Sequence, residues 1–455
     1  MKPLDYRMKI GPLDEGLTPQ KVAVIGSGAA GLAAAWSLSK CHDVVLCESE
    51  SRPGGHSHTV DVPTPSGSVP VDTGFIVFNR RNYPTLSAAF DHLRVPTRIS
   101  EMSFSVSVEG GSLEYSGDGL SGLFAQPTNA ANPYFWRMIA EIVRFYRGAG
   151  RLAREQDLEE ITLGDLLARE GYSAYFKYNH LFPMAAAIWS MPVGAIESFP
   201  AASFIRFFEQ HGLFQLRGEN RPVWRTVVGG SRAYVERLLA DFDGAVKTSS
   251  PVDAVRRSDD GIYVASQGVE ERFDQVVVAA HADQSLSMLA NPSAEERSIL
   301  GAFKYEKNRV LLHMDPALMP RRRRVWSSWN YMSDCSREPD GHLSVTYWMN
   351  RLQGLDPRLP LFASLNPLHD PVTSSVIGEY SYDHPSYDHA ALSAQKRLGS
   401  IQGRDRIWYC GSYFGYGFHE DAFASGIEVS TALGAAAPWL VDQRQKASSG
   451  DVRAA

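Results

Sequence analysis

The stretch "KVAVIGSGAAGLAAAWSLSK", Lys21 to Lys40, runs from a short apolar segment through glycines into an Ala- and Leu-rich segment. This order predicts a strand, a tight turn and a helix. Gly26 permits the turn, Gly28 lets the backbone approach a diphosphate, and Gly31 lets the helix pack closely on the strand. The N–H groups of the first helical turn then face the phosphate charge. The stretch therefore predicts a nucleotide-binding α/β unit.

The segments around this stretch support a dinucleotide site. "DVVLCES", Asp43 to Ser49, predicts a second strand ending at Glu48, twenty residues after Gly28. An acid at that place can accept hydrogen bonds from an adenosine ribose. "GDGLSG", Gly117 to Gly122, has the same glycine spacing, but the Pro- and Asn-containing segment that follows predicts no helix. We therefore predict one dinucleotide site and no separate nicotinamide domain.

The composition, with 44% hydrophobic and 21% charged residues, is that of an ordinary globular protein. The formal charge of −6 argues against nucleic acid as a partner, because that function needs a concentrated basic surface. "RRRR", Arg321 to Arg324, is a local exception. It is compatible with a solvated loop and with peripheral contact to an anionic membrane.

The cysteines indicate reduced thiols and a cytoplasmic location. They occur in no CxxC spacing and near no paired-histidine pattern, so neither a zinc site nor a redox dithiol is predicted, and we expect no metal. The first twenty residues contain no apolar signal region, and no run of about eighteen apolar residues occurs. The four cysteines are Cys41, Cys47, Cys335 and Cys410.

The order of motifs after the first unit carries a family resemblance. "SRPGGHSHTV", Ser51 to Val60, follows the acid, and "VPVDTGFIVFN", Val69 to Asn79, follows in turn. The chain thus has the glycine motif at Gly26 to Gly31, the acid Glu48, an R-x-G-G motif and a D-x-G motif, in this order. This order resembles the flavin-containing amine oxidase and phytoene desaturase superfamily, which binds FAD. The resemblance implies an α/β fold: a Rossmann-type, glutathione-reductase-like FAD-binding domain with an inserted α+β substrate domain.

The resemblance extends to later segments. "VVGGSRAYVERLLA", Val227 to Ala240, resembles the family's double glycine before a helix, and Arg406 to Leu433 resembles its last strand, glycine loop and flavin-facing helix. "VDTGFIVFNRRNYP", "IWSMP", "VTYWMNRLQ" and "GYGFHEDAFASG" are most similar to a bacterial subgroup of predicted NAD/FAD-binding oxidoreductases. The implied division assigns residues 20–79, 221–299 and 405–440 to the FAD-binding domain and residues 80–220 and 300–404 to the substrate domain.

The motifs and the resemblance together imply a set of FAD contacts. Two departures from the family pattern occur within it: His56 replaces the usual Arg after the double glycine, and the charged "HED", His419 to Asp421, replaces a small-residue pair. The predicted contacts are Gly26, Gly28, Ala30, Gly31, Glu48, Ser49, Arg52, Gly54, Gly55, His56, Gly74, Phe75, Val252, Gly411, Asp421, Ala422 and Phe423.

The closing helix is expected to point its N-terminus at the flavin, where N–H groups favour the negative charge of the reduced ring. His419 is the first candidate for a catalytic base because it titrates near neutrality and adjoins the glycine loop. A structural hydrogen-bonding role fits it equally well. Glu420 is the second candidate, although it and Asp421 can instead cap the helix while pointing away from the ring.

The expected substrate domain is rich in aromatic residues. In Asn132 to Gly150, an apolar stripe at helical spacing predicts a helix that faces the core or, less commonly, a membrane. An apolar roof over the flavin suits an apolar or amphipathic substrate. Our hypothesis is an FAD-dependent oxidoreductase that desaturates or isomerises a fatty acyl chain or isoprenoid by hydride transfer to flavin N5. The alternatives are an amine oxidase that releases peroxide and a flavin-binding protein without turnover; the oligomeric state is left open.

Overall fold

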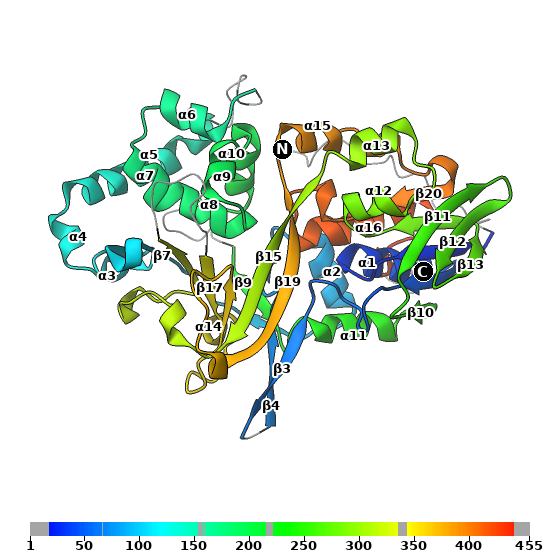
Figure 1. Ribbon diagram of the computed structural model, residues 1–455, viewed down its shortest axis with the longest axis horizontal. Helices are drawn as coiled ribbons and strands as arrows, with labels where there is room; N and C mark the ends of the chain where they lie inside the picture. The colour runs from blue at the N-terminus through cyan, green and yellow to red at the C-terminus, as the bar shows by residue number, and fades with distance from the viewer. Residues whose placement is uncertain are drawn as a thin grey trace, which may run out of the picture.

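A parallel sheet assembled from distant segments organises one lobe of the molecule (Figure 1). The computed structural model describes residues 18–65, 67–152, 158, 160–214, 222–334 and 344–440. Five strands lie in the order β10-β2-β1-β14-β20, and all neighbours are parallel. These strands are β1 (Lys21–Ile25), β2 (Asp43–Cys47), β10 (Ala245–Lys247), β14 (Gln275–Val278) and β20 (Ile407–Tyr409).

The central strands of this sheet are apolar because both faces are covered, as parallel sheets require. On one face, α1 (Ala29–Leu38) packs against α16 (His419–Ala432), and α11 (Arg232–Ala240) lies beside them. On the other face lie an antiparallel sheet of β11 (Val252–Ser258), β12 (Gly261–Ser266) and β13 (Val269–Phe273), and the helices α12 (Ala282–Met288) and α13 (Ala294–Leu300). This arrangement confirms the predicted Rossmann-type α/β fold.

The second lobe contains a seven-stranded sheet in the order β19-β15-β18-β17-β16-β7-β8. Its longest strands, β15 (Lys304–His313) and β19 (Val376–Ser386), form an antiparallel pair that runs between the two lobes in Figure 1. This pair is therefore placed to carry side chains toward the nucleotide lobe. The other strands are β7 (Phe104–Val108), β8 (Leu113–Ser116), β16 (Trp329–Ser333), β17 (Ser344–Trp348) and β18 (Phe362–Leu365).

A group of helices covers one end of this sheet around an aromatic core. Phenylalanines from several helices, including Phe135, Phe145, Phe182 and Phe208, are fully buried there. The helices are α3 (Gly119–Leu123), α4 (Thr128–Ala131), α5 (Pro133–Leu152), α6 (Leu163–Arg169), α7 (Ala174–Phe176), α8 (Phe182–Trp189), α9 (Val193–Glu197) and α10 (Ala201–Gln210). Phe135 and Ile142 of the α5 stripe belong to this core, as its spacing predicts, and Ile139 and Tyr146 pack against it.

The segment after Gly117 corrects one expectation. We predicted no helix there, yet α3 and α4 both form, as helices of only five and four residues. The strand before them, β8, lies at the edge of the seven-stranded sheet and pairs antiparallel with β7. The second glycine pattern is therefore outside any parallel nucleotide-binding unit.

The predicted domain boundary at residues 79 and 80 falls just before α2 (Pro84–His92). Leu86, Ala89 and Phe90 of α2 belong to the same core as α1, so this helix packs on the nucleotide lobe. A small sheet of β5 (Phe78–Asn79), β9 (Trp224–Val227) and β6 (Thr97–Ile99) also joins segments from both sides of that boundary. The division of the chain into domains stays a prediction, and its boundary at residues 220 and 221 lies outside the described residues.

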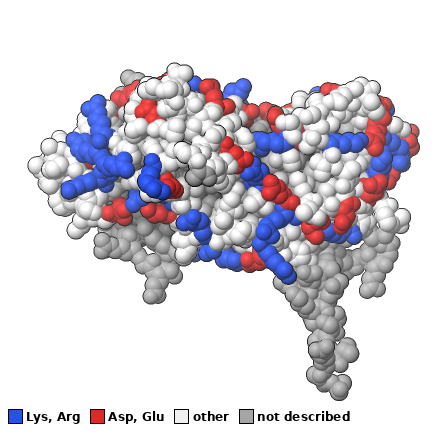
Figure 2. Space-filling model, turned by 90° about the horizontal axis from the view of Figure 1, so that it is seen from below, with Lys and Arg blue, Asp and Glu red and all other residues white. Residues whose placement is uncertain are grey.

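The surface carries both signs of charge, and Lys and Arg side chains gather at the end of the molecule that holds α3 and α4 (Figure 2). Among the described helices, none combines the length and the apolar character needed to cross a bilayer.

Replacing Gly426 of α16 tests the helix pair that supports the nucleotide lobe. An added Cβ would overlap the carbonyl oxygen of Ala30, so we expect Gly426→Ala to lower the free energy of unfolding by about 1–3 kcal/mol. Gly148→Ala in α5 is the control, because its Cβ would meet no atom within 4 Å, and it should raise stability by about 0.5–1 kcal/mol. Urea denaturation of both variants measures the difference; equal effects would contradict close packing of α1 on α16.

Candidate active site

A single cavity of about 1300 Å³ connects the two lobes. At one end its wall consists of the β1–α1 turn and the end of β2, and at the other it consists of α5 and α8. The loop before α16 and the strand β19 line the region between these ends. A long ligand can therefore contact the nucleotide lobe and the helical group at once.

The turn between β1 and α1 leaves room and hydrogen-bond donors for a ligand. Gly26 has φ +97°, which favours glycine, and its N–H donates to the carbonyl of Cys47 at 2.8 Å. Gly28 precedes α1 without a side-chain cap, so the first N–H groups of the helix are not used by one. A Cβ added at Gly28 would meet no atom within 4 Å, whereas one added at Gly55 would lie 3.1 Å from the Cα of Gly28. The two glycine turns thus form one cradle.

Glu48 stands at the end of β2 on the wall of this cradle. Its carboxylate accepts hydrogen bonds from the backbone N–H of Ser27 at 2.8 Å, the hydroxyl of Ser27 at 2.5 Å and the hydroxyl of Ser49 at 3.1 Å. These bonds hold the carboxylate beside the turn. Its predicted contact with a ribose stays a prediction.

Asp421 organises the loop before α16 from behind the cavity wall. Its Oδ2 accepts hydrogen bonds from the N–H groups of Tyr416 and Phe418, both at 2.9 Å. A Cβ added at Gly415 would overlap this carboxyl group, so glycine at that position makes room for it. Burial raises the pKa of Asp421 to about 7. Asp421 lies behind the residues that line the cavity, and its predicted contact with FAD stays a prediction.

His419 lies on the cavity wall at the start of α16. Its Nε2 lies 2.7 Å from the hydroxyl of Tyr234 and 3.4 Å from that of Ser57, and its ring stacks on Phe75 with centroids 3.9 Å apart. Burial lowers the pKa of His419 to about 3, so the imidazole is neutral at physiological pH. The geometry therefore gives His419 a fixed, uncharged position at the site, and its predicted role as a base stays a prediction.

Glu420, the second predicted base, has another role in the structure. Its carboxylate accepts hydrogen bonds from the N–H groups of Thr85 at 2.8 Å and Leu86 at 3.0 Å, and so caps the start of α2. It does not line the cavity. The physical reason is that the first turn of α16 packs against α2, which turns this side chain away from the site.

The other predicted FAD contacts divide into lining and supporting residues. Gly31 packs against Gly26, the N–H of Gly54 donates to Ser27, the guanidinium of Arg52 donates to Gly55, and Phe423 is buried in the core. Gly31, Arg52, Gly54 and Phe423 thus support the cavity wall from behind, and their predicted contacts with FAD stay predictions. The predicted contacts that line the cavity are Gly26, Gly28, Ala30, Glu48, Ser49, Gly55, His56, Gly74, Phe75, Val252, Gly411 and Ala422.

Sequence reasoning missed a group of side chains around His56. The Nε2 of His56 is buried without a hydrogen-bond partner, and its ring lies 5.6 Å from that of His384 and 4.9 Å from that of Tyr382. The Nδ1 of His384 lies 3.0 Å from the amide nitrogen of Asn308. Because an amide nitrogen only donates, Nδ1 accepts, and the neutral ring carries its proton on Nε2. Tyr382 and His384 are two residues apart on β19, so strand periodicity could have placed them on the same face.

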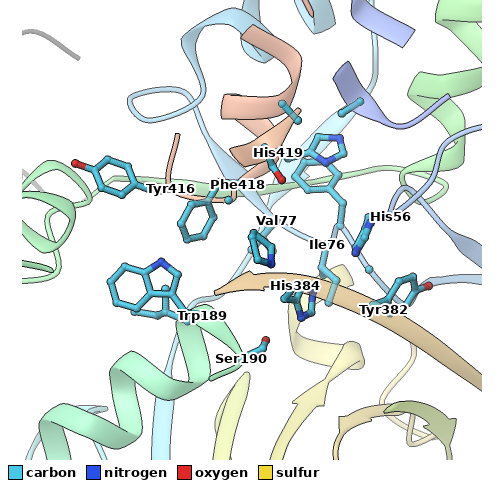
Figure 3. A pocket seen from close by; sticks show the side chains of 18 of the residues that line it. His56, Ile76, Val77, Trp189, Ser190, Tyr382, His384, Tyr416, Phe418 and His419 are labelled. Atoms are coloured by element: carbon cyan, nitrogen blue, oxygen red, sulfur yellow. The ribbon is translucent and has the colours of Figure 1, made fainter. Parts of the chain in front are cut away.

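Figure 3 shows these groups on one side of the cavity, with Tyr416, Phe418 and Trp189 on the other. Burial lowers the pKa of His384 to about 4. The histidines that line this part of the cavity are thus neutral and can serve as hydrogen-bond donors or acceptors. Across the described residues, no group of three His, Cys, Asp or Glu side chains is arranged to hold a metal ion.

The end of the cavity farthest from the nucleotide turn is mainly apolar. A buried group of three polar side chains also lines this end. The hydroxyl of Tyr115 lies 3.0 Å from Nδ1 of His180, and the hydroxyl of Tyr146 lies 3.0 Å from its Nε2. Burial lowers the pKa of His180 to about 3. The apolar lining comprises Leu123, Ile139, Ile142, Val143, Met184, Ala187, Ile188 and Leu213.

A parallel nucleotide-binding lobe joined by one cavity to an aromatic substrate lobe defines a flavin-dependent oxidoreductase. The chain belongs to the flavin containing amine oxidoreductase family, whose model matches residues 29–357. It is an FAD-dependent enzyme. The structure fits this cofactor, because it provides the open cradle at Gly28, the uncapped start of α1 and the buried Nε2 of His56 that lacks a partner.

Solved structures share this fold across nearly their whole length. A CLA-producing fatty acid isomerase from P. acnes has 17% identity and a TM-score of 0.62, covering 91% of this chain and 97% of its own. A putrescine oxidase variant has 17% identity and a TM-score of 0.65, covering 92% and 99%. Cyclohexylamine oxidase from Brevibacterium oxydans IH-35A has 13% identity and a TM-score of 0.63, also covering 92% and 99%. At these identities the likeness shows the fold alone.

Gly28→Val tests the FAD cradle. The backbone at Gly28, with φ −65° and ψ −179°, suits valine, and no protein atom would clash with the new Cβ. We expect the free energy of unfolding of the FAD-free chain to change by less than about 1 kcal/mol, because the new side chain enters open space. The added methyl groups occupy the space of the diphosphate, so bound flavin per protein should fall by about tenfold or more. Normal flavin content in this variant would contradict the assignment.

Asp421→Asn tests the buried carboxyl group. The pKa of Asp421 rises from 3.8 to about 7 on folding, so the folded state binds more protons than the unfolded state across that interval. Wild-type stability should therefore fall relative to Asp421→Asn by at least about 1 kcal/mol as the pH rises from about 4 to about 7. The amide oxygen of Asn can still accept both loop N–H groups. Denaturation at several pH values measures this difference, and parallel pH curves would contradict the prediction.

Proposed function

We propose that this FAD-dependent oxidoreductase desaturates or isomerises an apolar or amphipathic substrate, such as a fatty acyl chain or an isoprenoid. The observation that carries the proposal is the apolar far end of the cavity. Ile139, Ile142 and Val143 line it from α5, and Met184 and Ile188 line it from α8. We call this part of the cavity the apolar sleeve. A hydrocarbon chain can fill it without leaving polar groups unsatisfied.

Charge at this end also favours an apolar chain. The described cavity lining that comes from α5 and α8 contains no carboxylate. An ammonium group placed there would be desolvated without a counter-charge, which is costly. The acids that line the cavity, Glu48, Glu101, Asp118 and Asp383, come from other segments.

FAD supplies, when bound, an acceptor for a hydride equivalent from a substrate C–H bond. The residues of this chain position the substrate and exclude water, with aromatic side chains such as Trp189 and Phe418 forming part of the wall. A proton that leaves the neighbouring substrate atom needs an acceptor. His419 is our candidate for this acceptor, because it lines the cavity and its neutral ring is held by the hydroxyl of Tyr234, 2.7 Å from Nε2.

Oxidation of an amine, with peroxide release after reoxidation by oxygen, is the second candidate. The aromatic side chains Trp189, Tyr416 and Phe418 beside the cavity favour it, since a neutral amine is held well by aromatic rings. Two of the similar structures are named as a putrescine oxidase and a cyclohexylamine oxidase.

A cytoplasmic location is part of the proposal. In the part of the chain that the structure describes, Cys41, Cys47 and Cys410 are free thiols. Burial raises the pKa of Cys410, so this thiol is unreactive and serves as core. Cys335 lies outside the described residues.

Anaerobic bleaching of the bound flavin tests the proposed substrate class. We expect fatty acyl and isoprenoid compounds to bleach the flavin, or fatty acids to be isomerised with catalytic flavin, and amines to have no effect. Val143→Thr keeps the shape of the side chain but replaces one methyl group with a hydroxyl, which should lower kcat/KM for the apolar substrate by about fivefold.

Val269→Thr on β13 is the matched control, because Val269 is 67% exposed and lies outside the cavity lining. It should leave kcat/KM unchanged. Bleaching by amines alone, with stoichiometric peroxide in air, would replace the proposed function with the second candidate.

A further inference from the structure

We propose that one end of the molecule docks on an anionic lipid bilayer. This end is formed by α3, α4, the start of α5 and the neighbouring arginine loop, Arg321 to Arg324. We call this surface the docking face, defined by Leu120, Tyr134, Trp136, Arg321, Arg323 and Arg324. The inference adds a partner to the proposed function and rests on the proposed apolar substrate. Binding to vesicles is measured without turnover, so the two proposals can fail separately.

Large apolar side chains stand out from the docking face. Leu120 of α3 is 69% exposed, and Tyr134 and Trp136 of α5 are 64% and 51% exposed. The indole N–H of Trp136 donates to the carbonyl of Ala130 at 2.8 Å, and its ring lies 5.1 Å from that of Phe124. These contacts hold the tryptophan in place at the surface. Aromatic rings with one polar atom are the side chains that favour the bilayer interface.

The arginine loop adds positive charge beside these side chains. It leads into the short helix η5 (Arg323–Val325), which packs against α3 and β8. The side chain of Arg322 pairs with the buried carboxylate of Glu114 at 2.8 Å and so anchors the loop. Arg321, Arg323 and Arg324 are exposed.

Positive charge also gathers at this end of the molecule as a whole. Basic side chains gather at the end that holds α3 and α4, although the chain carries a net charge of −6 (Figure 2). The guanidinium of Arg323 lies 4.2 Å from the ring of Trp326, which fixes its direction. Acids also occur nearby, at Glu109 and Asp118, so the attraction is local and depends on how the arginines are presented.

The docking face and the cavity share the same helices. Leu120 of α3 is exposed, whereas Leu123 of the same helix lines the cavity. On α5, Trp136 is exposed and Ile139 lines the cavity one turn later. The exposed residues Gly117 and Asp118 also line the cavity, so it reaches the surface beside the docking face. A lipid chain that leaves a docked bilayer can therefore enter the apolar sleeve with little exposure to water.

Sedimentation of the full-length holoprotein with vesicles tests the proposal. We expect binding to phosphatidylcholine vesicles that contain phosphatidylglycerol, weak binding to phosphatidylcholine alone, and weaker binding at high salt. The double variant Arg321→Glu/Arg324→Glu should lose about tenfold or more in partition coefficient, since each basic residue near the surface contributes to attraction. Leu120→Ser/Trp136→Ser should weaken binding similarly by removing buried apolar area.

Two matched variants at the other lobe serve as controls. Arg297→Glu on α13 reverses an exposed charge, and Val269→Ser on β13 removes an exposed apolar side chain. Both should bind vesicles like the wild type, and all variants should keep their flavin content. Absence of binding to anionic vesicles would overturn the docking face. Binding that neither double variant reduces would overturn it as well. A protein that binds vesicles but is bleached only by amines would keep the docking face and lose the proposed substrate.

Discussion

The close packing of α1 on α16 is the contact on which the site depends. Gly426 faces the backbone of Ala30 so closely that a single methyl group would not fit between them. The contact brings the first and last helices of the nucleotide lobe side by side, and the first residues of both helices line the same cavity. Two helix N-termini therefore present partial positive charge to one ligand, which suits the diphosphate and the reduced ring of FAD.

This arrangement explains why so few charged side chains act in the site. Burial keeps His384 and His419 neutral, and Glu420 and Asp421 are occupied with backbone N–H groups outside the cavity wall. Around the start of α16, neutral side chains and backbone N–H groups therefore form the cavity wall. Such a site stabilises anionic parts of a cofactor while leaving the substrate in largely neutral surroundings, which is consistent with the apolar sleeve formed by α5 and α8.

The sequence predicts those features that depend on local physics. The turn at Gly26 and the strand ending at Glu48 follow from sterics and periodicity over a few residues, and the structure has both. The role of Glu420 could not be predicted in the same way, because it caps a helix whose N–H groups lie more than three hundred residues earlier in the chain. Likewise, alternation along β19 places His384 and Tyr382 on one face, but the sequence does not say that this face meets His56.

The order of strands in the parallel sheet has a consequence for biosynthesis. The strand β20 and the helix α16 are made after the other described elements of both lobes, yet they complete the sheet edge and one wall of the cofactor cavity. A nascent chain can form its helical group early, but its nucleotide lobe lacks an edge strand and a covering helix until residues 407–432 have been made. The cavity wall that faces the flavin is thus complete only when segments from both ends of the nucleotide lobe have met.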